Sequence, residues 1–104
     1  MNKRPDILRM RPDGPLLQQG VDAFRQLLIS NIASSCKGYV IDLQAQKLSA
    51  ESLYLILSFQ KSAEALGRSV GLLLSKEEKE NFTAFHAQEA FVIGETEDEV
   101  LEKL

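Results

Sequence analysis

The 104-residue chain has little of the chemistry on which disulfide-rich, secreted and membrane-spanning proteins depend. Its only cysteine, Cys36, excludes an internal disulfide and fits a reducing compartment. No apolar run approaches the length of about 18 residues that predicts a membrane-spanning helix. The charged N-terminus lacks the apolar block of a secretory signal. We therefore expect a cytoplasmic protein without membrane insertion.

Basic residues cluster only near the N-terminus. The net charge is −3, and residues 76–104 carry nine acids against three lysines. Only residues 3–11 form a short basic arm, with four of the 12 basic residues. A protein that follows a phosphate backbone needs a broad basic face, so we expect no nucleic-acid partner.

Residues that could carry catalysis or bind a metal are isolated from one another. His86 is the only histidine, so a histidine metal site has no partners nearby in the sequence. A triad of Ser49, His86 and Asp42 has no support in the spacing, and Asp42 is better interpreted as an acceptor for loop backbone. No glycine-rich loop predicts a P-loop or dinucleotide site. We expect no enzymatic activity, no cofactor and no metal.

What the chain does have is an alternation of strand and helix patterns. "ILRMR" alternates apolar and charged residues, and Pro12-Asp13-Gly14 supplies turn chemistry, so residues 7–17 predict a short strand or hairpin. Apolar residues at three-to-four spacing or in short runs predict the further elements. These are a helix over 20–33, a strand over 39–43, a helix over 49–66, a strand over 69–74, a helix from Ser75, a strand over 91–93 and a helix from Thr96.

The order of these elements predicts an α/β fold. The strand–helix–strand unit from Tyr39 to Leu74 is long enough for a crossover between parallel strands. "SVGLLL" (69–74) is nearly continuous apolar, as in a strand covered on both faces, and Gly67 is placed to end the preceding helix. We expect one domain over residues 1–104, with a small, mostly parallel sheet and alternating helices.

Helix starts at the carboxyl edge of this sheet are candidate binding positions, because ligands of open parallel sheets tend to lie there. Ser75 with Glu78, and Thr96 with Glu99, have capping-box spacing. A helix N-terminus can hold a phosphate, but Glu51, Glu77 and Glu78 would repel an anion. A small-ligand sensor using this edge would therefore take a neutral or cationic ligand.

Several strings, in their order and spacing, resemble the STAS domain shared by anti-sigma factor antagonists and sulfate transporters. They cover about residues 7–104 and are "GPLLQQGVDAFRQLL" (14–28), "GYVIDL" (38–43), "GRSVGLLL" (67–74) and "FTAFHAQEAFVIGETEDEVLEKL" (82–104). The resemblance implies alternating strands and helices around a small sheet, and no enzymatic activity.

The resemblance also implies protein partners. In the anti-sigma factor antagonist branch, the unphosphorylated domain binds an anti-sigma factor that is also a serine kinase, and phosphorylation releases it. Other branches form domains of membrane transporters or small cytoplasmic subunits docked on transporter ATPases. The phosphoacceptor of the first branch is the second serine of an Asp-Ser-Ser-Gly turn at the start of the long helix.

This sequence departs from that turn, since it reads Ser49-Ala50-Glu51-Ser52. With one residue deleted in the preceding loop, Glu51 takes the acceptor position and Ser49 that of the aspartate. Without the deletion Ser52 takes the acceptor position, so Ser49 and Ser52 stay open as alternative acceptors. Glu51 is then either a partial mimic of phosphate or a first-turn glutamate favoured by the helix dipole. Ser49 is interpreted as the N-cap.

The same helix offers a candidate partner-binding face. Glu51, Tyr54, Ser58 and Lys61 recur at three-to-four spacing opposite much of the apolar stripe, with Ser49 and Ser52 at its start. Exposed aromatic residues are enriched at interfaces, so Tyr54 carries most weight. The alternative is an ordinary solvated face. The oligomeric state cannot be predicted from the sequence.

Overall fold

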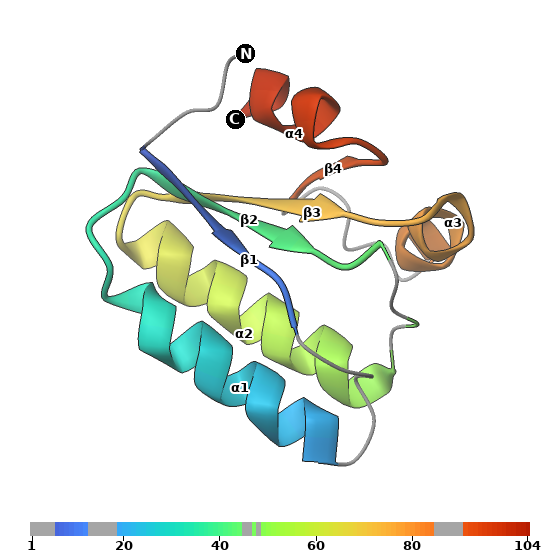
Figure 1. Ribbon diagram of the computed structural model, residues 1–104, viewed down its shortest axis with the longest axis horizontal. Coiled ribbons are helices and arrows are strands. Elements are labelled where there is room, and N and C mark those ends of the chain that lie inside the picture. The colour runs from blue at the N-terminus through green and yellow to red at the C-terminus, as the bar shows by residue number, and fades with distance from the viewer. Residues whose placement is uncertain (1–5, 13–18, 45–46, 48, 85–90) are drawn as a thin grey trace.

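The computed structural model describes residues 6–12, 19–44, 47, 49–84 and 91–104, in which strands and helices alternate (Figure 1). The elements are β1 (Ile7–Met10), α1 (Gln19–Ile32), β2 (Gly38–Asp42), α2 (Ala50–Ala65), β3 (Ser69–Leu73), α3 (Lys76–Ala84), β4 (Val92–Gly94) and α4 (Glu97–Lys103). The α/β alternation is confirmed, and so is the N-terminal strand. The turn and second arm of the possible hairpin (13–17) lie outside the described residues.

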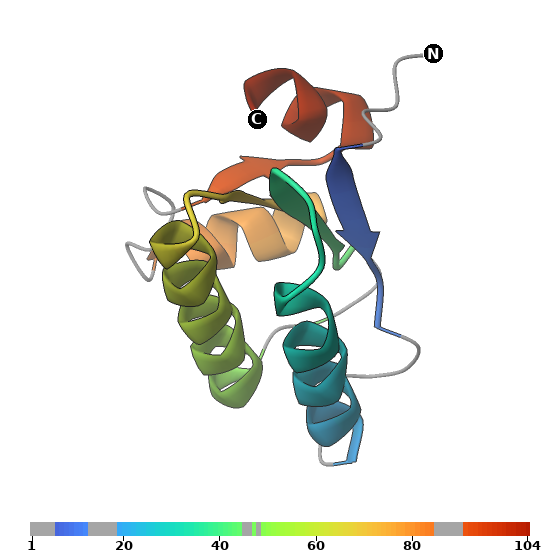
Figure 2. The ribbon, with the colours of Figure 1, turned by 90° about the vertical axis from the view of Figure 1, so that its left-hand side faces the viewer.

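The four strands form one sheet in the order β1-β2-β3-β4, and every described pairing is parallel. Gly38 opens β2 opposite Ile7 on one side and Ser69 on the other. Parallel neighbours cannot be joined by a tight turn, so each connection crosses the sheet and contains a helix. α1 and α2 lie side by side on one face, and α4 lies on the other (Figures 1 and 2).

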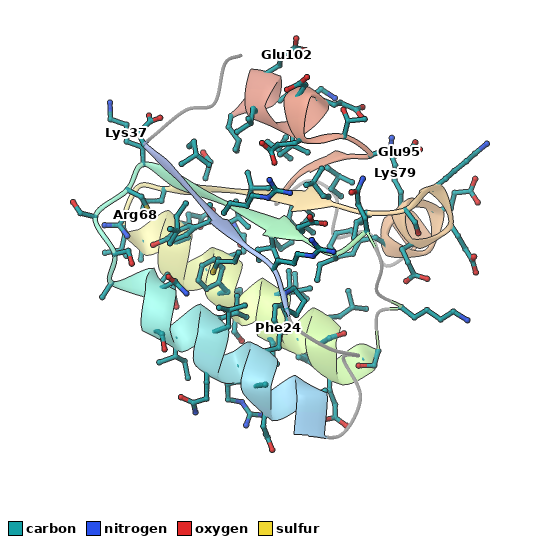
Figure 3. All side chains as sticks on the ribbon, in the orientation of Figure 1. Phe24, Lys37, Arg68, Lys79, Glu95 and Glu102 are labelled. Carbon is teal, nitrogen blue, oxygen red and sulfur yellow. The ribbon has the colours of Figure 1, made fainter. Side chains whose placement is uncertain are left out.

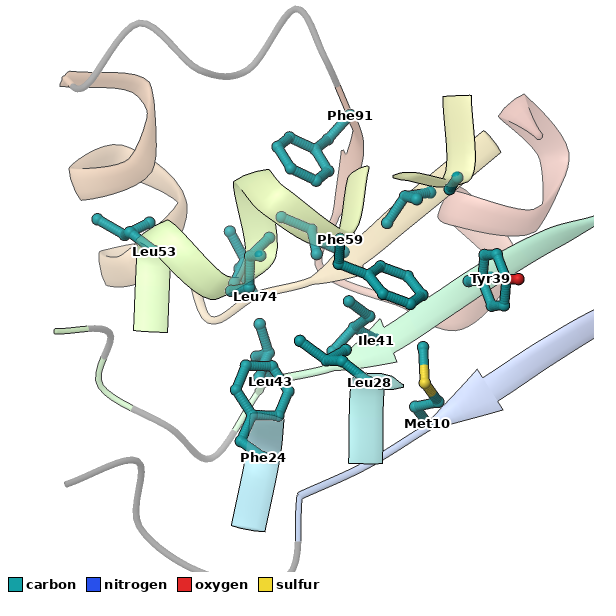
Figure 4. Close-up of a cluster of buried hydrophobic side chains, with 14 of the residues drawn as sticks. Met10, Phe24, Leu28, Tyr39, Ile41, Leu43, Leu53, Phe59, Leu74 and Phe91 are labelled. Atoms are coloured by element: carbon teal, nitrogen blue, oxygen red, sulfur yellow. The ribbon is translucent and has the colours of Figure 1, made fainter. Parts of the chain in front are cut away.

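The larger core lies between the sheet and α1, α2 and α3. Alternate strand residues face it, as the pleat requires, and Tyr39, Ile41 and Leu72 are fully buried there. The aromatic rings interlock, since the Tyr39 and Phe59 centroids lie 4.8 Å apart in an edge-to-face arrangement (Figure 4). On the other side of the core, Phe82 of α3 packs edge-to-face on Phe91.

The smaller core lies on the opposite face and depends on two glycines. α4 has seven residues and places Val100, fully buried, against Val40 and Leu73. A Cβ atom on Gly71 would overlap Val100 Cγ1, and one on Gly94 would lie 2.9 Å from Val100 Cγ2. The valine is therefore seated in a recess that only glycine leaves open.

The C-terminal end of α2 is closed by Gly67, as its position predicts. Gly67 has φ +72°, and its N–H donates to the Glu64 carbonyl at 2.9 Å. The Arg68 N–H donates to the Ala63 carbonyl, also at 2.9 Å. This pair of bonds is the Schellman motif, which requires a residue with positive φ at this position.

The next side chain, Arg68, ties the end of α2 to the end of α1. Its Nη1 donates to the Ile32 carbonyl at 2.9 Å and to the Tyr39 hydroxyl at 2.5 Å. The Tyr39 hydroxyl donates to the same carbonyl at 2.8 Å. Burial raises the pKa of the Tyr39 hydroxyl above its ordinary value of 10.0, although the bond from Arg68 opposes the shift.

The glycine recess predicts the effect of Gly71→Ala. The added methyl group overlaps Val100, so the free energy of unfolding should fall by about 1–3 kcal/mol. Urea denaturation followed by circular dichroism measures this loss. Val100→Ala in the same background should recover part of it, because the smaller side chain makes room. If the losses of the two single variants simply added in the double variant, the two residues would not share a recess.

The shifted pKa of Tyr39 predicts a loss of stability at high pH. The unfolded chain loses the tyrosine proton from about pH 10, whereas the folded chain retains it to higher pH. The stabilising contribution is therefore complete below pH 10 and disappears as the pH rises through the raised folded pKa. Urea denaturation between pH 8 and 11 should show this decline, and Tyr39→Phe should reduce its slope. An unchanged slope in Tyr39→Phe would contradict the assignment.

Candidate functional site

The departure from the Asp-Ser-Ser-Gly turn lies at the start of α2, on the carboxyl edge of the sheet (Figure 1). Ser49 is the N-cap, with extended backbone at φ −101° and ψ 168°. The Ser52 N–H donates to Ser49 Oγ at 3.2 Å, and the Ser49 N–H donates to Ser52 Oγ at 2.8 Å. The two serines thus form a reciprocal capping box, in which Ser52 takes the place usually held by Glu or Gln.

Ser52 is enclosed by this box. Its side chain is fully buried, and its hydroxyl also donates to the Ser49 carbonyl at 2.9 Å. Its hydroxyl oxygen accepts from the Ser49 hydroxyl at 3.2 Å. Ser52 therefore does not lie on the exposed face with the other expected partner-binding residues. A kinase could reach it only after the first turn of α2 had opened, whereas Ser49 is half-buried.

Glu51 lies in the same turn but faces solvent. Its carboxylate adds a negative charge at the positive end of the helix dipole, where such a charge is favourable by about 0.3–1 kcal/mol. The capping is done by Ser49 and Ser52, so the turn does not need Glu51 for its geometry. The equivalence of Glu51 to a phosphoacceptor stays a prediction.

The outer face of α2 has the exposure that its pattern predicts. We call Glu51, Tyr54, Ser58 and Lys61 the α2 stripe, and all four are exposed. Tyr54 is 74% exposed, an unusual position for a large aromatic ring. The opposite side of the helix is buried in the core and consists of Ser52, Leu53, Ile56, Phe59 and Ala63.

A groove that the sequence did not predict borders this stripe. It has a volume of about 280 Å³ and lies between α1 and α2. Ser58 belongs both to its wall and to the α2 stripe, and the rest of the wall is Arg25, Leu28, Ile29, Ile32, Leu55, Phe59 and Ser62. Ile29 is 57% exposed. Ile29 could have indicated the groove from the sequence, because it is a large apolar residue outside the buried stripe of α1.

Asp42 has a structural role at the carboxyl edge. Its Oδ1 accepts the Gln44 N–H at 3.2 Å, which confirms the interpretation as an acceptor for loop backbone. Its Oδ2 lies 3.1 Å from Arg9 Nη2, and Arg9 Nη1 lies 2.5 Å from Glu97 Oε1. Arg9 thus bridges β1, β2 and α4. The sequence did not reveal this bridge, because its members are far apart in the chain.

The hydroxyl bonds of the two other expected capping boxes are present in the structure. The Glu78 N–H donates to Ser75 Oγ at 3.2 Å, and Glu78 is buried. The Glu99 N–H donates to Thr96 Oγ1, also at 3.2 Å, whereas the Glu99 carboxylate accepts the Glu95 N–H at 2.9 Å. That hydrogen bond lowers the pKa of Glu99.

Of the three glutamates expected at the carboxyl edge, Glu51 and Glu77 are exposed and Glu78 is buried. Between α3 and α4, Lys79 Nζ lies 3.7 Å from Glu95 Oε2 (Figure 3). Within the described ranges, no group of three or more His, Cys, Asp or Glu residues is placed to hold a metal ion. Cys36 is half-buried beside the larger core, and His86 lies outside the described residues.

The described helices include none that is long and apolar enough to cross a bilayer.

Among solved structures, the chain is similar to the crystal structure of a sulfate transporter family protein from Wolinella succinogenes. The TM-score is 0.76 at 19% sequence identity, over 99% of this chain and 88% of the other. The fold is STAS-like. At this identity the likeness shows the fold alone. No model of a known protein family and no curated protein matches the sequence.

The serine box predicts a contrast between two neighbouring substitutions. Ser52→Ala removes the acceptor of the Ser49 N–H and should lower the free energy of unfolding by about 1–2 kcal/mol. Glu51→Ala removes only the interaction with the dipole and should cost less than about 1 kcal/mol. Guanidinium denaturation of both variants gives the comparison. A larger loss for Glu51→Ala would mean that the carboxylate, and not the serine pair, holds the turn.

Proposed function

We propose that this chain is a non-enzymatic regulatory domain of the STAS type that binds another protein through the α2 stripe and Ser49. The observation that carries the proposal is the exposure of Tyr54, which projects from a helix whose opposite side is fixed in the core. Tyrosine combines large apolar area with a hydroxyl and is favoured at interfaces. Glu51 and Lys61 frame it with opposite charges.

The structural roles of the polar candidates support a binding function over catalysis. Asp42 is engaged by Arg9 and by the loop backbone. Ser52 is engaged in the capping box. A nucleophile needs a base within hydrogen-bond reach and access to substrate, and the contacts of these two residues serve the fold instead.

Glu51 supports a domain without the serine switch of anti-sigma factor antagonists. A carboxylate carries one negative charge, whereas phosphoserine carries about −1.5 to −2 and has a third acceptor oxygen. A glutamate at the acceptor position cannot be cycled by a kinase and a phosphatase. The domain would therefore hold one binding state, unless Ser49 is the acceptor.

Two partner classes fit a cytoplasmic STAS-type domain, namely an anti-sigma factor with serine kinase activity and a transporter ATPase. The solved protein of similar fold belongs to the sulfate transporter family, which favours the transporter class. The permanent charge of Glu51 supports it too, because a constitutive docking subunit does not need a phosphorylation cycle.

Affinity capture from the native cytoplasm tests the docking face. The wild type should recover a protein that Tyr54→Ala and Glu51→Lys both lose, with capture reduced at least about tenfold, because an anchor residue at an interface is commonly worth 2 kcal/mol or more. Two matched controls should keep the partner. Tyr54→Phe retains the ring, and Glu102→Lys makes the same charge change on exposed α4. Undiminished capture by Tyr54→Ala would overturn the proposed face.

A parallel bait, Glu51→Ser, separates the two partner classes. A serine kinase captured by this variant alone, with phosphate added to the bait's intact mass, would identify Glu51 as a locked switch. The same transporter ATPase on both baits, without phosphate, would identify a constitutive docking subunit.

The groove between α1 and α2 favours a second candidate function, a small-ligand sensor. Its apolar wall and volume of about 280 Å³ fit a small apolar molecule better than the acidic strand edge does. Thermal shift with a metabolite panel tests this, since a bound ligand raises the melting temperature by mass action. The absence of any shift above background would count against the sensor.

A further inference from the structure

The charges of the α2 stripe are arranged so that the stripe is complementary to itself. Glu51 lies near the N-terminal end and Lys61 ten positions later, about 15 Å along the helix axis. Tyr54 and Ser58 lie between them, and residue 56 is the midpoint of both pairs. All four side chains are exposed.

A two-fold axis through this midpoint reverses the direction of the helix. It maps position 51 onto position 61, and position 54 onto position 58. When two copies meet antiparallel on this face, Glu51 of each copy lies opposite Lys61 of the other, which gives two attractive pairs. Parallel contact would instead place Glu51 beside Glu51 and Lys61 beside Lys61, which is repulsive. The pattern therefore selects one orientation.

The groove beside the stripe gives Tyr54 a place to bind. In the antiparallel arrangement Tyr54 of one copy lies opposite Ser58 of the other, and Ser58 forms part of the groove wall. The half-exposed Ile29 and the apolar Leu55 line the same groove. An aromatic ring placed there would cover apolar surface that is now in contact with water.

We infer that the α2 stripe also binds a second copy of this chain, in an antiparallel, two-fold symmetric dimer. Such an interface is isologous, because the same residues contribute from both sides. Exposed ion pairs contribute little individually and are screened by salt. The dimer is therefore weak and dissociates as ionic strength rises. This inference concerns the same face as the proposed function and adds a second occupant to it, so that each can fail without the other.

Charge reversal tests the pairing in the full-length protein. Sedimentation velocity from about 10 µM to 1 mM should show concentration-dependent dimerisation of the wild type. Glu51→Lys and Lys61→Glu should each raise the dissociation constant at least about tenfold, because each turns two attractive pairs into two repulsive ones. Glu102→Lys has the same net charge as Glu51→Lys and should dimerise like the wild type. Circular dichroism verifies that each variant is folded.

Two restorations distinguish specific pairing from a general charge effect. The double variant Glu51→Lys/Lys61→Glu exchanges the charges and should dimerise again. An equimolar mixture of the two single variants should form a heterodimer, since one copy carries two lysines and the other two glutamates. A wild type that stays monomeric at 1 mM, or a failure of both restorations, would overturn the inference.

The double variant also separates this inference from the proposed function. A different protein keeps its own charges, so the double variant should regain self-association without regaining capture of that protein. Loss of capture by Tyr54→Ala together with a monomeric wild type would leave the proposed function standing and remove the dimer. Undiminished capture by Tyr54→Ala together with restored dimers would remove the heterologous docking face and leave the dimer.

Discussion

The parallel pairing of β2 with β3 is the constraint on which the other features depend. The strands run in the same direction, so the chain must return across the sheet between them, and α2 is that return. The sheet fixes which side of the helix is buried and places its N-terminus at the carboxyl edge. The same requirement between β1 and β2 places α1 beside α2. Because α1 and α2 pack side by side, the α2 stripe and the groove lie on one continuous surface, whichever residues are exposed there.

Most of the elements could be predicted from local patterns. The strand expected over 39–43 occupies 38–42, and the helix expected over 49–66 occupies 50–65 with its cap at Ser49. These predictions are correct because the period of the apolar residues indicates which face of an element is buried. The end of the helix is correct because Gly67 occupies a backbone position with positive φ. The exposure of the α2 stripe follows by the same reasoning, as the complement of the buried face.

Features that depend on side-chain direction or distant contacts could not be predicted. Ser52 is expected on the partner-binding face, but its hydroxyl completes the capping box with Ser49 and is buried. The usual pattern names Glu or Gln at this position and so gives no sign of a serine box. Glu99 has the expected spacing from Thr96, yet its carboxylate reaches the Glu95 N–H. Arg9 joins Asp42 and Glu97 across three elements, and no local pattern encodes such a contact.

The charge of Glu51, in the first turn of α2, bears on how binding to the α2 stripe could be controlled. A phosphorylation switch works by changing the charge of one residue, whereas a glutamate keeps its charge fixed. In a face that binds both a second copy and another protein, the two occupants exclude one another, and their ratio follows mass action. Under the proposed dimer, the fixed carboxylate would belong to a domain whose occupancy follows concentration and ionic strength. The buried Ser52 fits this arrangement, because a hydroxyl that caps α2 cannot be modified without the cost of opening the first turn of that helix.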